Sequence, residues 1–229
     1  MRHKMFTHRF FPLPFVAALC LLLNSCQQST SPNPNTQWYT QSFPSSVGST
    51  WQYIIYDTTF APGGKFQSAR TESLLVVVIQ VDSISQTERL ARWVYAYSDT
   101  ADTATVTLTP TTVSITHAFN VFDSYSKLSK QNAEYVFPLI VGKGWGSTYS
   151  NGGDTSTVVG VTYVTVPSGT FGDASHILSL NYTIGPVSYF DVDSWFVPNI
   201  GFVQFQESEA YDANSEKVYV ELVSYELHS

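Results

Sequence analysis

Two carboxylates within a short aromatic stretch are the residues best suited to chemistry in this sequence. Asp191 and Asp193 alternate with other residues and are flanked by Tyr189 and Trp195. If the stretch is a strand, the four side chains project from one face, because alternate residues of a strand point the same way. A face of this kind is suited to a sugar, a cation or a basic ligand, and paired carboxylates can act as acid and base.

The spacing of these carboxylates also fits a simpler interpretation. Residues two apart on one strand are separated by only about 6.5–7 Å at the backbone. Glycosidases use carboxyl pairs at comparable separations, but usually from different strands across a cleft. A solvent-exposed face with two solubilising acids is therefore preferred over a face that borders a ligand site.

The histidines form no recognisable set. His117, His176 and His228 are far apart in the sequence and lack the spacing of metal ligands. His176 shares strand parity with Leu178 and Leu180, which predicts an inward-facing core histidine with a hydrogen-bond partner. We expect no metal site.

Known catalytic and nucleotide-binding motifs are also missing from the sequence. It holds no G-x-S-x-G, H-E-x-x-H, P-loop or dinucleotide fingerprint. Ser168 lies in a Pro-Ser-Gly turn, and the sequence indicates neither a base nor oxyanion donors for it. We therefore expect a protein that is not an enzyme and that uses no cofactor.

Composition favours an all-β protein that binds no nucleic acid. Aromatic residues make up 15% of the 229 residues and charged residues only 13%. Aromatic and β-branched residues suit a pleated, half-buried surface. After residue 25, 18 acidic side chains face only eight Lys and Arg, so there is no basic face to displace counterions from nucleic acid.

The first 25 residues read as a signal peptide of the lipoprotein type. A basic segment precedes an apolar run at 11–23 that is too short to span a bilayer. The run leads into Leu23-Asn24-Ser25-Cys26, which resembles the bacterial lipobox and would make Cys26 the lipidated residue. The alternative is an ordinary cleaved signal peptide with a leftover cysteine. No later cysteine is present to pair with Cys26, which favours the lipoprotein.

Residues 26–42 are rich in Ser, Thr, Asn and Gln and read as a flexible tether. Gln27 stands where enteric lipoproteins retained at the inner membrane carry Asp, and no acidic cluster follows Cys26. By that resemblance we expect an outer-membrane lipoprotein, with the periplasmic leaflet favoured over the cell surface.

The pattern F-P-x-x-V-G-x-x-W occurs twice, at 43–51 and at 137–145, with a constant offset of 94 residues. Proline restrains the chain to a turn, and glycine allows it to change direction before a tryptophan that begins a strand. We interpret each copy as a turn that delivers a Trp to the core. The sequence predicts a single β domain over 43–229, built from two related halves at 43–136 and 137–229.

Strand-like segments separated by turn signals fill most of this domain. The apolar run at 74–79 predicts a strand covered on both faces. A short helix is expected only around 120–133. Regular strands with short turns predict a curved antiparallel sheet that forms a half-barrel or a barrel-like domain, with a β-sandwich as the alternative. The expected strands lie near 51–58, 74–79, 90–98, 105–109, 112–116, 156–166, 174–184, 187–197, 201–211 and 217–227.

Four motifs together carry a family resemblance. They are V-G-x-x-W at 47–51, F-P-L-x-V-G-x-x-W at 137–145, V-P-x-G-x-F at 166–171 and W-[YF]-x-P-x-x-G at 195–201. As a set they resemble an uncharacterised family of Gram-negative bacterial lipoproteins, with Ser168 where that family usually has Ala. The resemblance implies a curved open sheet reminiscent of periplasmic lipid-carrier lipoproteins, and no established activity. Its recurring residues are turn formers and aromatics: Phe43, Pro44, Gly48, Trp51, Phe137, Pro138, Gly142, Trp145, Pro167, Gly169, Pro198 and Gly201.

Two functions from different classes follow from these observations. The first is an anchored lipoprotein that binds or carries an apolar or amphipathic ligand, because a curved sheet can enclose a pocket lined by aromatic rings. The second is a structural or interaction subunit of an envelope complex. The membrane, through the N-terminal lipid, is the expected partner, and a lipid, a glycan or a protein is a further candidate.

Overall fold

The structure is a computed structural model that describes residues 37–98, 100–116, 133–149, 152–183, 188–211 and 214–228. Cys26, the signal peptide, most of the tether and nearly all of the expected helix at 120–133 lie outside the described residues. The described residues belong to one compact unit. No helix among the described residues is long and apolar enough to cross a bilayer.

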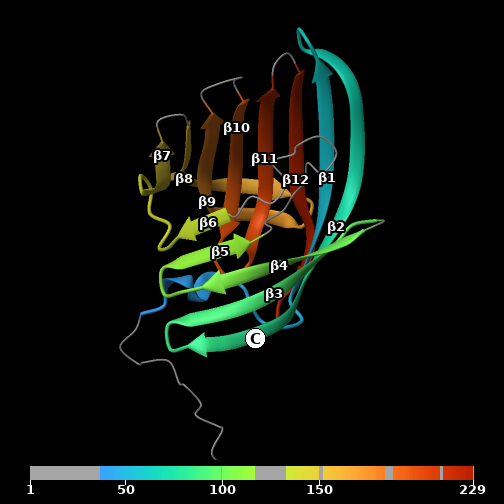
Figure 1. Ribbon diagram of the computed structural model, residues 1–229. Coiled ribbons are helices and arrows are strands. Elements are labelled where there is room, and N and C mark those ends of the chain that lie inside the picture. The colour runs from blue at the N-terminus through green and yellow to red at the C-terminus, as the bar shows by residue number, and fades with distance from the viewer. Residues whose placement is uncertain are drawn as a thin grey trace, which may run out of the picture. The chain divides into compact units, whose positions relative to one another are not determined.

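Twelve strands and one short 3-10 helix make up the described chain (Figure 1). The helix is η1, at Tyr39–Ser42. The strands of the first half are β1 (Thr50–Ala61), β2 (Lys65–Ser85), β3 (Glu88–Ala96), β4 (Ala101–Leu108), β5 (Thr112–Thr116) and β6 (Ala133–Val136). Those of the second half are β7 (Gly144–Tyr149), β8 (Gly152–Val166), β9 (Gly169–Thr183), β10 (Ser188–Val197), β11 (Gly201–Tyr211) and β12 (Asn214–Glu226).

All twelve strands belong to one antiparallel sheet that is nearly closed into a barrel. Its order is β6-β5-β4-β3-β2-β1-β12-β11-β10-β9-β8-β7, so every neighbouring pair except β1–β12 is also adjacent in sequence. The ladder between β1 and β12 joins the first and last strands, from Thr50 opposite Glu226 to Phe60 opposite Ser215. The prediction of a curved, barrel-like antiparallel sheet is confirmed, and the sandwich alternative is wrong because all the strands of the described residues belong to this one sheet.

An up-and-down order places alternate turns at opposite ends of the sheet. We call the proximal end the one where β1 begins and where the β2–β3, β4–β5, β6–β7, β8–β9 and β10–β11 turns lie. The distal end holds the β1–β2, β3–β4 and remaining turns. The first described residues belong to the proximal end: the Tyr39 amide donates to the Pro110 carbonyl at 2.8 Å, and the Asn199 amide donates to the Ser42 carbonyl at 2.7 Å.

Strand alternation builds the core inside the curved sheet. On β4 and β5, the apolar side chains of Val106, Leu108, Val113 and Ile115 are buried, as alternation along the strands expected at 105–109 and 112–116 requires. The run at 74–79 behaves differently from the prediction. Its even-numbered residues are buried, but Leu75 and Ile79 are 42% and 46% exposed. The strand is therefore covered on one face only, because the single sheet has no second layer outside it.

The two copies of the repeated motif form the same backbone turn. Gly48 donates its amide to the Val78 carbonyl at 2.9 Å, and Gly142 donates to the Val158 carbonyl at 2.8 Å. Both glycines have positive φ, 89° and 84°, which a residue with a side chain rarely adopts. The copies thus share the turn chemistry predicted for them. The division of the domain into two related halves stays a prediction.

The phenylalanines of the two copies meet in the core. Phe43 and Phe137 are each 3% exposed, and their rings contact edge to face with centroids 6.4 Å apart. Both pack on Phe196 of β10. The tryptophans differ. Trp51 is 2% exposed, whereas Trp145 is only partly buried and packs against the margin of the core, so the expectation of two equivalent core tryptophans is wrong.

The third and fourth motifs form proximal turns. Gly169, after Pro167, and Gly201, after Pro198, have φ values of 144° and 103°. A Cβ at residue 201 would lie 3.3 Å from Cγ of Pro44, so the fourth motif packs closely on the first. The prolines and glycines of these motifs shape the turns, which agrees with their interpretation as turn formers.

Candidate functional site

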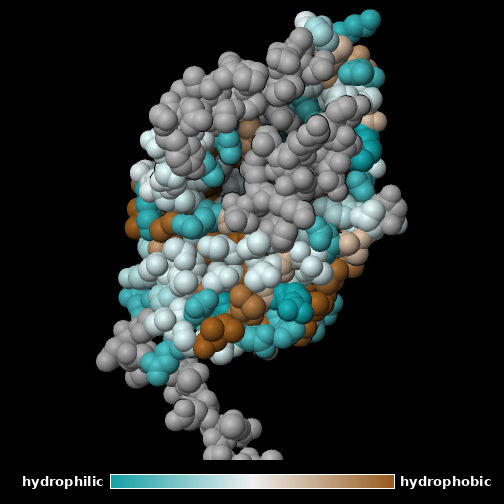
Figure 2. Space-filling view, in the orientation of Figure 1, coloured by the Kyte–Doolittle hydropathy of each residue, from teal (hydrophilic) through white to brown (hydrophobic). Residues whose placement is uncertain are grey.

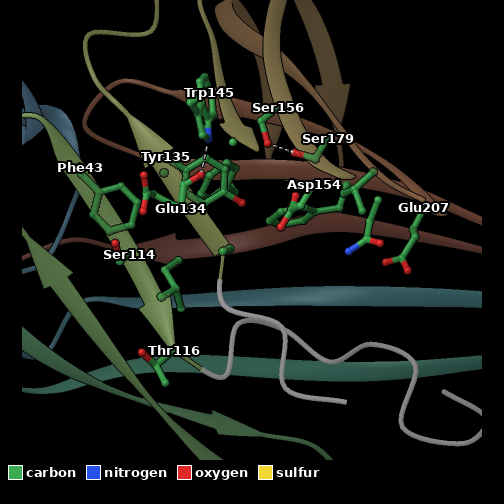
Figure 3. A pocket seen from close by; sticks show the side chains of 18 of the residues that line it. Phe43, Ser114, Thr116, Glu134, Tyr135, Trp145, Asp154, Ser156, Ser179 and Glu207 are labelled. Atoms are coloured by element: carbon green, nitrogen blue, oxygen red, sulfur yellow. Dashed lines mark hydrogen bonds between the residues drawn. The ribbon is translucent and has the colours of Figure 1, made fainter. Parts of the chain in front are cut away.

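A cavity of about 650 Å³ lies inside the curved sheet, lined by inward-facing side chains of strands from both halves (Figure 3). Its walls come from β1, β2, β3, β5, β6 and β7 through β11. The cavity exists because one sheet curls around an interior that the core fills only in part. Its size is in the range of sites that hold small molecules.

Aromatic rings form one side of this cavity. Phe43 stacks on Trp93 with centroids 5.7 Å apart and planes at 9°, and Trp93 stacks on Trp51 at 5.4 Å. The Trp51 indole is fixed by donating Nε1–H to the Ile200 carbonyl at 2.6 Å. Phe202 packs against Phe43 at 6.5 Å. We call these rings the aromatic floor; they offer a rigid apolar surface to a ligand.

Hydroxyls, an amide and carboxylates form the other side. The hydroxyls of Ser156 and Ser179 are hydrogen-bonded at 2.8 Å between neighbouring strands β8 and β9. Asp154, also on β8, faces the same space, and partial desolvation raises the pKa of its carboxyl. The polar lining residues on β8, β9 and β11 are Asp154, Ser156, Ser179, Asn181 and Glu207; we call them the polar wall.

The charge of the lining restricts which ligands suit the cavity. Among its described residues there are carboxylates but no Lys or Arg. A phosphate or carboxylate inside would lie near like charges without a compensating cation. A neutral hydroxyl-bearing group or a cation would instead find hydrogen-bond acceptors and negative charge. The arrangement therefore suits an amphipathic ligand with an apolar part and a neutral or cationic polar part.

The lining offers no assembled nucleophile. Its serines have no histidine or cysteine beside them among the described lining residues. Within the same described parts of the chain, no group of three or more His, Cys, Asp or Glu is arranged to hold a metal ion.

The cavity borders the place where the sheet does not close. β6 and β7 are the two end strands and no ladder joins them. The Trp145 indole on β7 instead donates Nε1–H to the Glu134 carbonyl on β6 at 2.7 Å (Figure 3). Lys143 Nζ donates to the Phe137 and Pro138 carbonyls at 3.1 and 3.3 Å. We call this junction the seam; the Trp145 side chain, not a backbone ladder, spans it.

The predicted ligand face lies on the other side of β10. Phe190 and Val192 line the cavity, so alternation turns Asp191, Asp193 and Trp195 to the outer face. Tyr189 belongs to β10 opposite Ala210, and its side chain lies outside the described residues. The sequence thus grouped these residues on one face, and the structure places that face away from the cavity. Their role as a ligand face stays a prediction.

His176 joins this outer group. Its Nε2 is 2.5 Å from Oδ1 of Asp193, and its ring stacks on Trp195 with centroids 4.6 Å apart. The prediction of an inward-facing core histidine is wrong, because His176 pairs with Trp195 in the ladder and shares its outer face. The expected hydrogen-bond partner is present as Asp193. Burial, followed by repulsion from Asp193, raises the pKa of Asp191.

Sequence reasoning missed the polar wall. The strand expected near 156–166 leaves Asp154 outside it, but β8 begins at Gly152 and brings Asp154 to the cavity. Glu207 has the same inward parity on β11 as Phe205, and the residue is only 8% exposed. Strand parity was the available signal for Glu207, since it is a charged residue on an otherwise apolar inward face.

The fold and cavity define a class: a single antiparallel sheet, nearly closed, around an interior site. A known structure shares this architecture. A protein from Bacteroides fragilis, provisionally described as exported and with a YmcC-like fold, is 15% identical with a TM-score of 0.50, over 80% of this chain and 98% of that chain. A provisionally described lipoprotein from Parabacteroides distasonis is 13% identical with a TM-score of 0.49, over 81% and 98%.

No protein-family model matches the chain, and no curated protein matches it. At 15% identity the likeness to the Bacteroides fragilis protein supports the fold and not an activity.

Proposed function

We propose that the protein is a lipid-anchored envelope protein that binds an amphipathic ligand in the cavity and catalyses no reaction. The observation that carries the proposal is the division of the cavity into an aromatic floor and a polar wall without cations. An apolar segment lying on the floor gains roughly 25 cal/mol per Å² of buried apolar surface. Acceptors of the polar wall then select a neutral or cationic head.

The anchor is proposed at Cys26, in the lipobox-like stretch that ends there. The description of the Bacteroides fragilis protein as exported supports an envelope location, as does the resemblance of the four motifs to Gram-negative lipoproteins. We place the protein at the outer membrane, in the periplasmic leaflet, on the sequence around Cys26.

Binding of a matched series of short-chain amphiphiles tests this function. Octyl glucoside, octyltrimethylammonium and octyl phosphate share one apolar chain and differ in the head. Tryptophan fluorescence below micelle formation reports on the floor, where Trp51 and Trp93 lie. We expect saturable binding of the neutral and cationic compounds and weaker binding of the phosphate. Equal response to all three, or none, would contradict the proposal.

Variants separate the cavity from other surfaces. Trp145→Ala removes a ring that lines the cavity, and Trp195→Ala removes a ring of similar size from the outer face. We expect weaker binding in the first and unchanged binding in the second. Native mass spectrometry of the protein purified gently from membranes would then identify a natural ligand of the expected chemistry.

A second candidate is an interaction subunit of an envelope complex. The unpaired edges of β6 and β7 favour it, because an edge strand presents free backbone groups to a partner strand. A stoichiometric protein partner in the same native mass spectra, with no small ligand, would favour this function over ligand binding.

A further inference from the structure

Exposed aliphatic side chains gather at the proximal end of the sheet. In the first half they lie in the turn of the first motif copy and on the adjoining part of β2; in the second half they lie in the turn of the second copy and on β8, where one tyrosine joins them. We call them the apolar rim: Val47, Ile79, Ile84, Ile140, Val141, Val159, Val161 and Tyr163, all between 43% and 80% exposed. Among the described residues of the distal end, Phe66 beside the β1–β2 turn is the large apolar side chain of comparable exposure, at 59%.

The motif turns themselves create this exposure. The Gly48–Val78 hydrogen bond is flanked by Val47 and Ile79, which are 52% and 46% exposed, and the Gly142–Val158 bond is flanked by Val141 and Val159, which are 56% and 43% exposed. The two copies thus display exposed aliphatic residues at equivalent positions. Figure 2 shows apolar side chains gathered at the lower edge of that view, over β3 and the lower end of β2. An exposed apolar set of this extent indicates an interaction surface.

The length of chain between Cys26 and the first described residues indicates which partner covers the apolar rim. Gln37 to Ser42 packs on the β4–β5 and β10–β11 turns, so the N-terminal segment leaves the body at the proximal end. Cys26 precedes Gln37 by 11 residues, a length that spans at most about 40 Å. The 12 residues of β1 alone extend about 40 Å toward the distal end. A lipid on Cys26 therefore holds the proximal end nearer to the bilayer.

Charge at the proximal end agrees with an apolar contact. Lys143 is held by two backbone carbonyls, and the Arg89 guanidinium lies 4.7 Å above the Trp38 ring. Both cations are thus engaged by groups of the protein itself. Aliphatic and tyrosine side chains are those that enter the interface between headgroups and acyl chains.

We infer that the apolar rim docks on the lipid bilayer to which the protein is anchored. The inference rests on the proposed anchor at Cys26 and is independent of what the cavity binds. Docked in this way, the protein lies with its proximal turns in the interface and its distal end away from the membrane. The contact depends on apolar insertion and not on the anionic lipid content.

Single-cysteine labelling of the lipidated protein in vesicles tests the docking. The mature chain has no cysteine other than Cys26, whose thiol the anchor consumes, so Val159→Cys and Phe66→Cys can each carry one environment-sensitive fluorophore. The vesicles contain phosphatidylethanolamine and phosphatidylglycerol, with or without a nitroxide-labelled lipid. We expect a blue shift and strong quenching at 159 and neither at 66. Equal responses at the two sites would overturn the inference.

A second comparison separates apolar docking from mere nearness to the anchor. Val47→Asp/Val141→Asp places charges in the rim at exposed positions, so folding should persist, which circular dichroism checks. With the label at 159 we expect this background to lose the quenching, and a Phe66→Asp background to retain it. Quenching that survives the rim substitutions would overturn the inference.

Intact mass shows whether Cys26 is acylated. An unacylated mature protein overturns the anchor and the docking together, whereas acylated protein without rim quenching overturns the docking alone.

A change of the rim label with protein concentration in the absence of vesicles would instead identify a second copy as the occupant and overturn the lipid assignment. Replacing phosphatidylglycerol by phosphatidylcholine should leave the quenching unchanged. A loss on that replacement would overturn apolar insertion as the mode of contact.

Discussion

The indole of Trp145 and the backbone of Glu134 meet across the seam: Nε1–H of the tryptophan donates to the glutamate carbonyl at 2.7 Å. β7 and β6, which carry them, share no ladder, although β1 and β12 are fully paired in the corresponding place between the two halves. If the halves are related, as the sequence predicts, the seam is the counterpart of the β1–β12 ladder. One side chain there takes the place of a row of backbone bonds, and it also lines the cavity.

Removing this bond should loosen the seam locally. Trp145→Phe keeps an aromatic ring and leaves the Glu134 carbonyl without that donor, so we expect a loss of about 1 kcal/mol in the free energy of unfolding. Hydrogen exchange should quicken for the amides of β6. Trp195→Phe, on the outer face, serves as control and should leave β6 unchanged. Unaltered exchange in Trp145→Phe would show that the bond does not hold the seam.

The two motif tryptophans should differ in their effect on stability. Trp51 is 2% exposed, stacks on Trp93 and is hydrogen-bonded, so Trp51→Ala should cost about 3–5 kcal/mol. Trp145 is only partly buried, so Trp145→Ala should cost about 1–2 kcal/mol. Urea unfolding measures both. Equal losses would mean that Trp145 is buried as deeply as its counterpart.

Much of the fold could be predicted because a strand is indicated by the local pattern of residues along it. Ten of the twelve strands overlap an expected segment. The missed strands, β6 and β7, are only four and six residues long, and β7 contains two glycines. Short edge strands carry too few residues for a period-two pattern to show.

The site was harder to predict because it depends on which face of each strand is inside. The sequence put Asp191 and Asp193 on one face of β10 correctly but could not say that this face is outward. That choice is made by the curvature of the whole sheet, which turns Phe190 and Val192 toward the cavity. His176 shows the same limit: Leu178 and Leu180 at matching parity resemble a core stripe, yet His176 stacks on Trp195 on the outer face.

Alkaline pH should unfold the protein through buried tyrosines. Burial raises the pKa of Tyr53 and Tyr95, and Tyr53 donates its hydroxyl to the Phe202 carbonyl at 2.8 Å. In the unfolded chain a tyrosine ionises near pH 10, roughly the reference value. The folded pKa is higher, so this contribution to stability is complete below about pH 10 and is lost as the pH rises above it.

Ultraviolet absorbance of tyrosinate checks this expectation. A class of tyrosines should ionise only together with loss of the circular dichroism signal, and Tyr53→Phe should reduce that class by one. Ionisation of all tyrosines before any unfolding would contradict the assignment.

Asp191→Asn should stabilise the protein at neutral pH. The pKa of Asp191 is raised by burial and by Asp193, so the folded state binds its proton more tightly than the unfolded state does. Stability from this group is therefore complete below the ordinary value of 3.8 and declines as the pH rises through the raised pKa. The thermal midpoint of Asp191→Asn should exceed that of the parent at pH 7. The two midpoints should be equal at about pH 3, because below the reference pKa the Asp191 carboxyl is protonated in both the folded and the unfolded state. A constant difference at both pH values would point to a cause other than ionisation.

Carboxylates on the two faces of the sheet should affect ligand binding differently. Asp154→Asn and Glu207→Gln remove negative charge from the polar wall while keeping the shape of the side chains. Each should weaken binding of octyltrimethylammonium by about 2- to 5-fold, in line with about 0.5–1 kcal/mol for a partly solvated charge pair. Binding of octyl glucoside should change less, and octyl phosphate should bind better.

The matched control is Asp191→Ala/Asp193→Ala, on the outer face, which should leave all three affinities unchanged. Titration followed by tryptophan fluorescence measures these affinities. If the outer-face variant alone weakens binding, the ligand lies on the face of Asp191 and Asp193, as the sequence pattern first indicated, and not in the cavity.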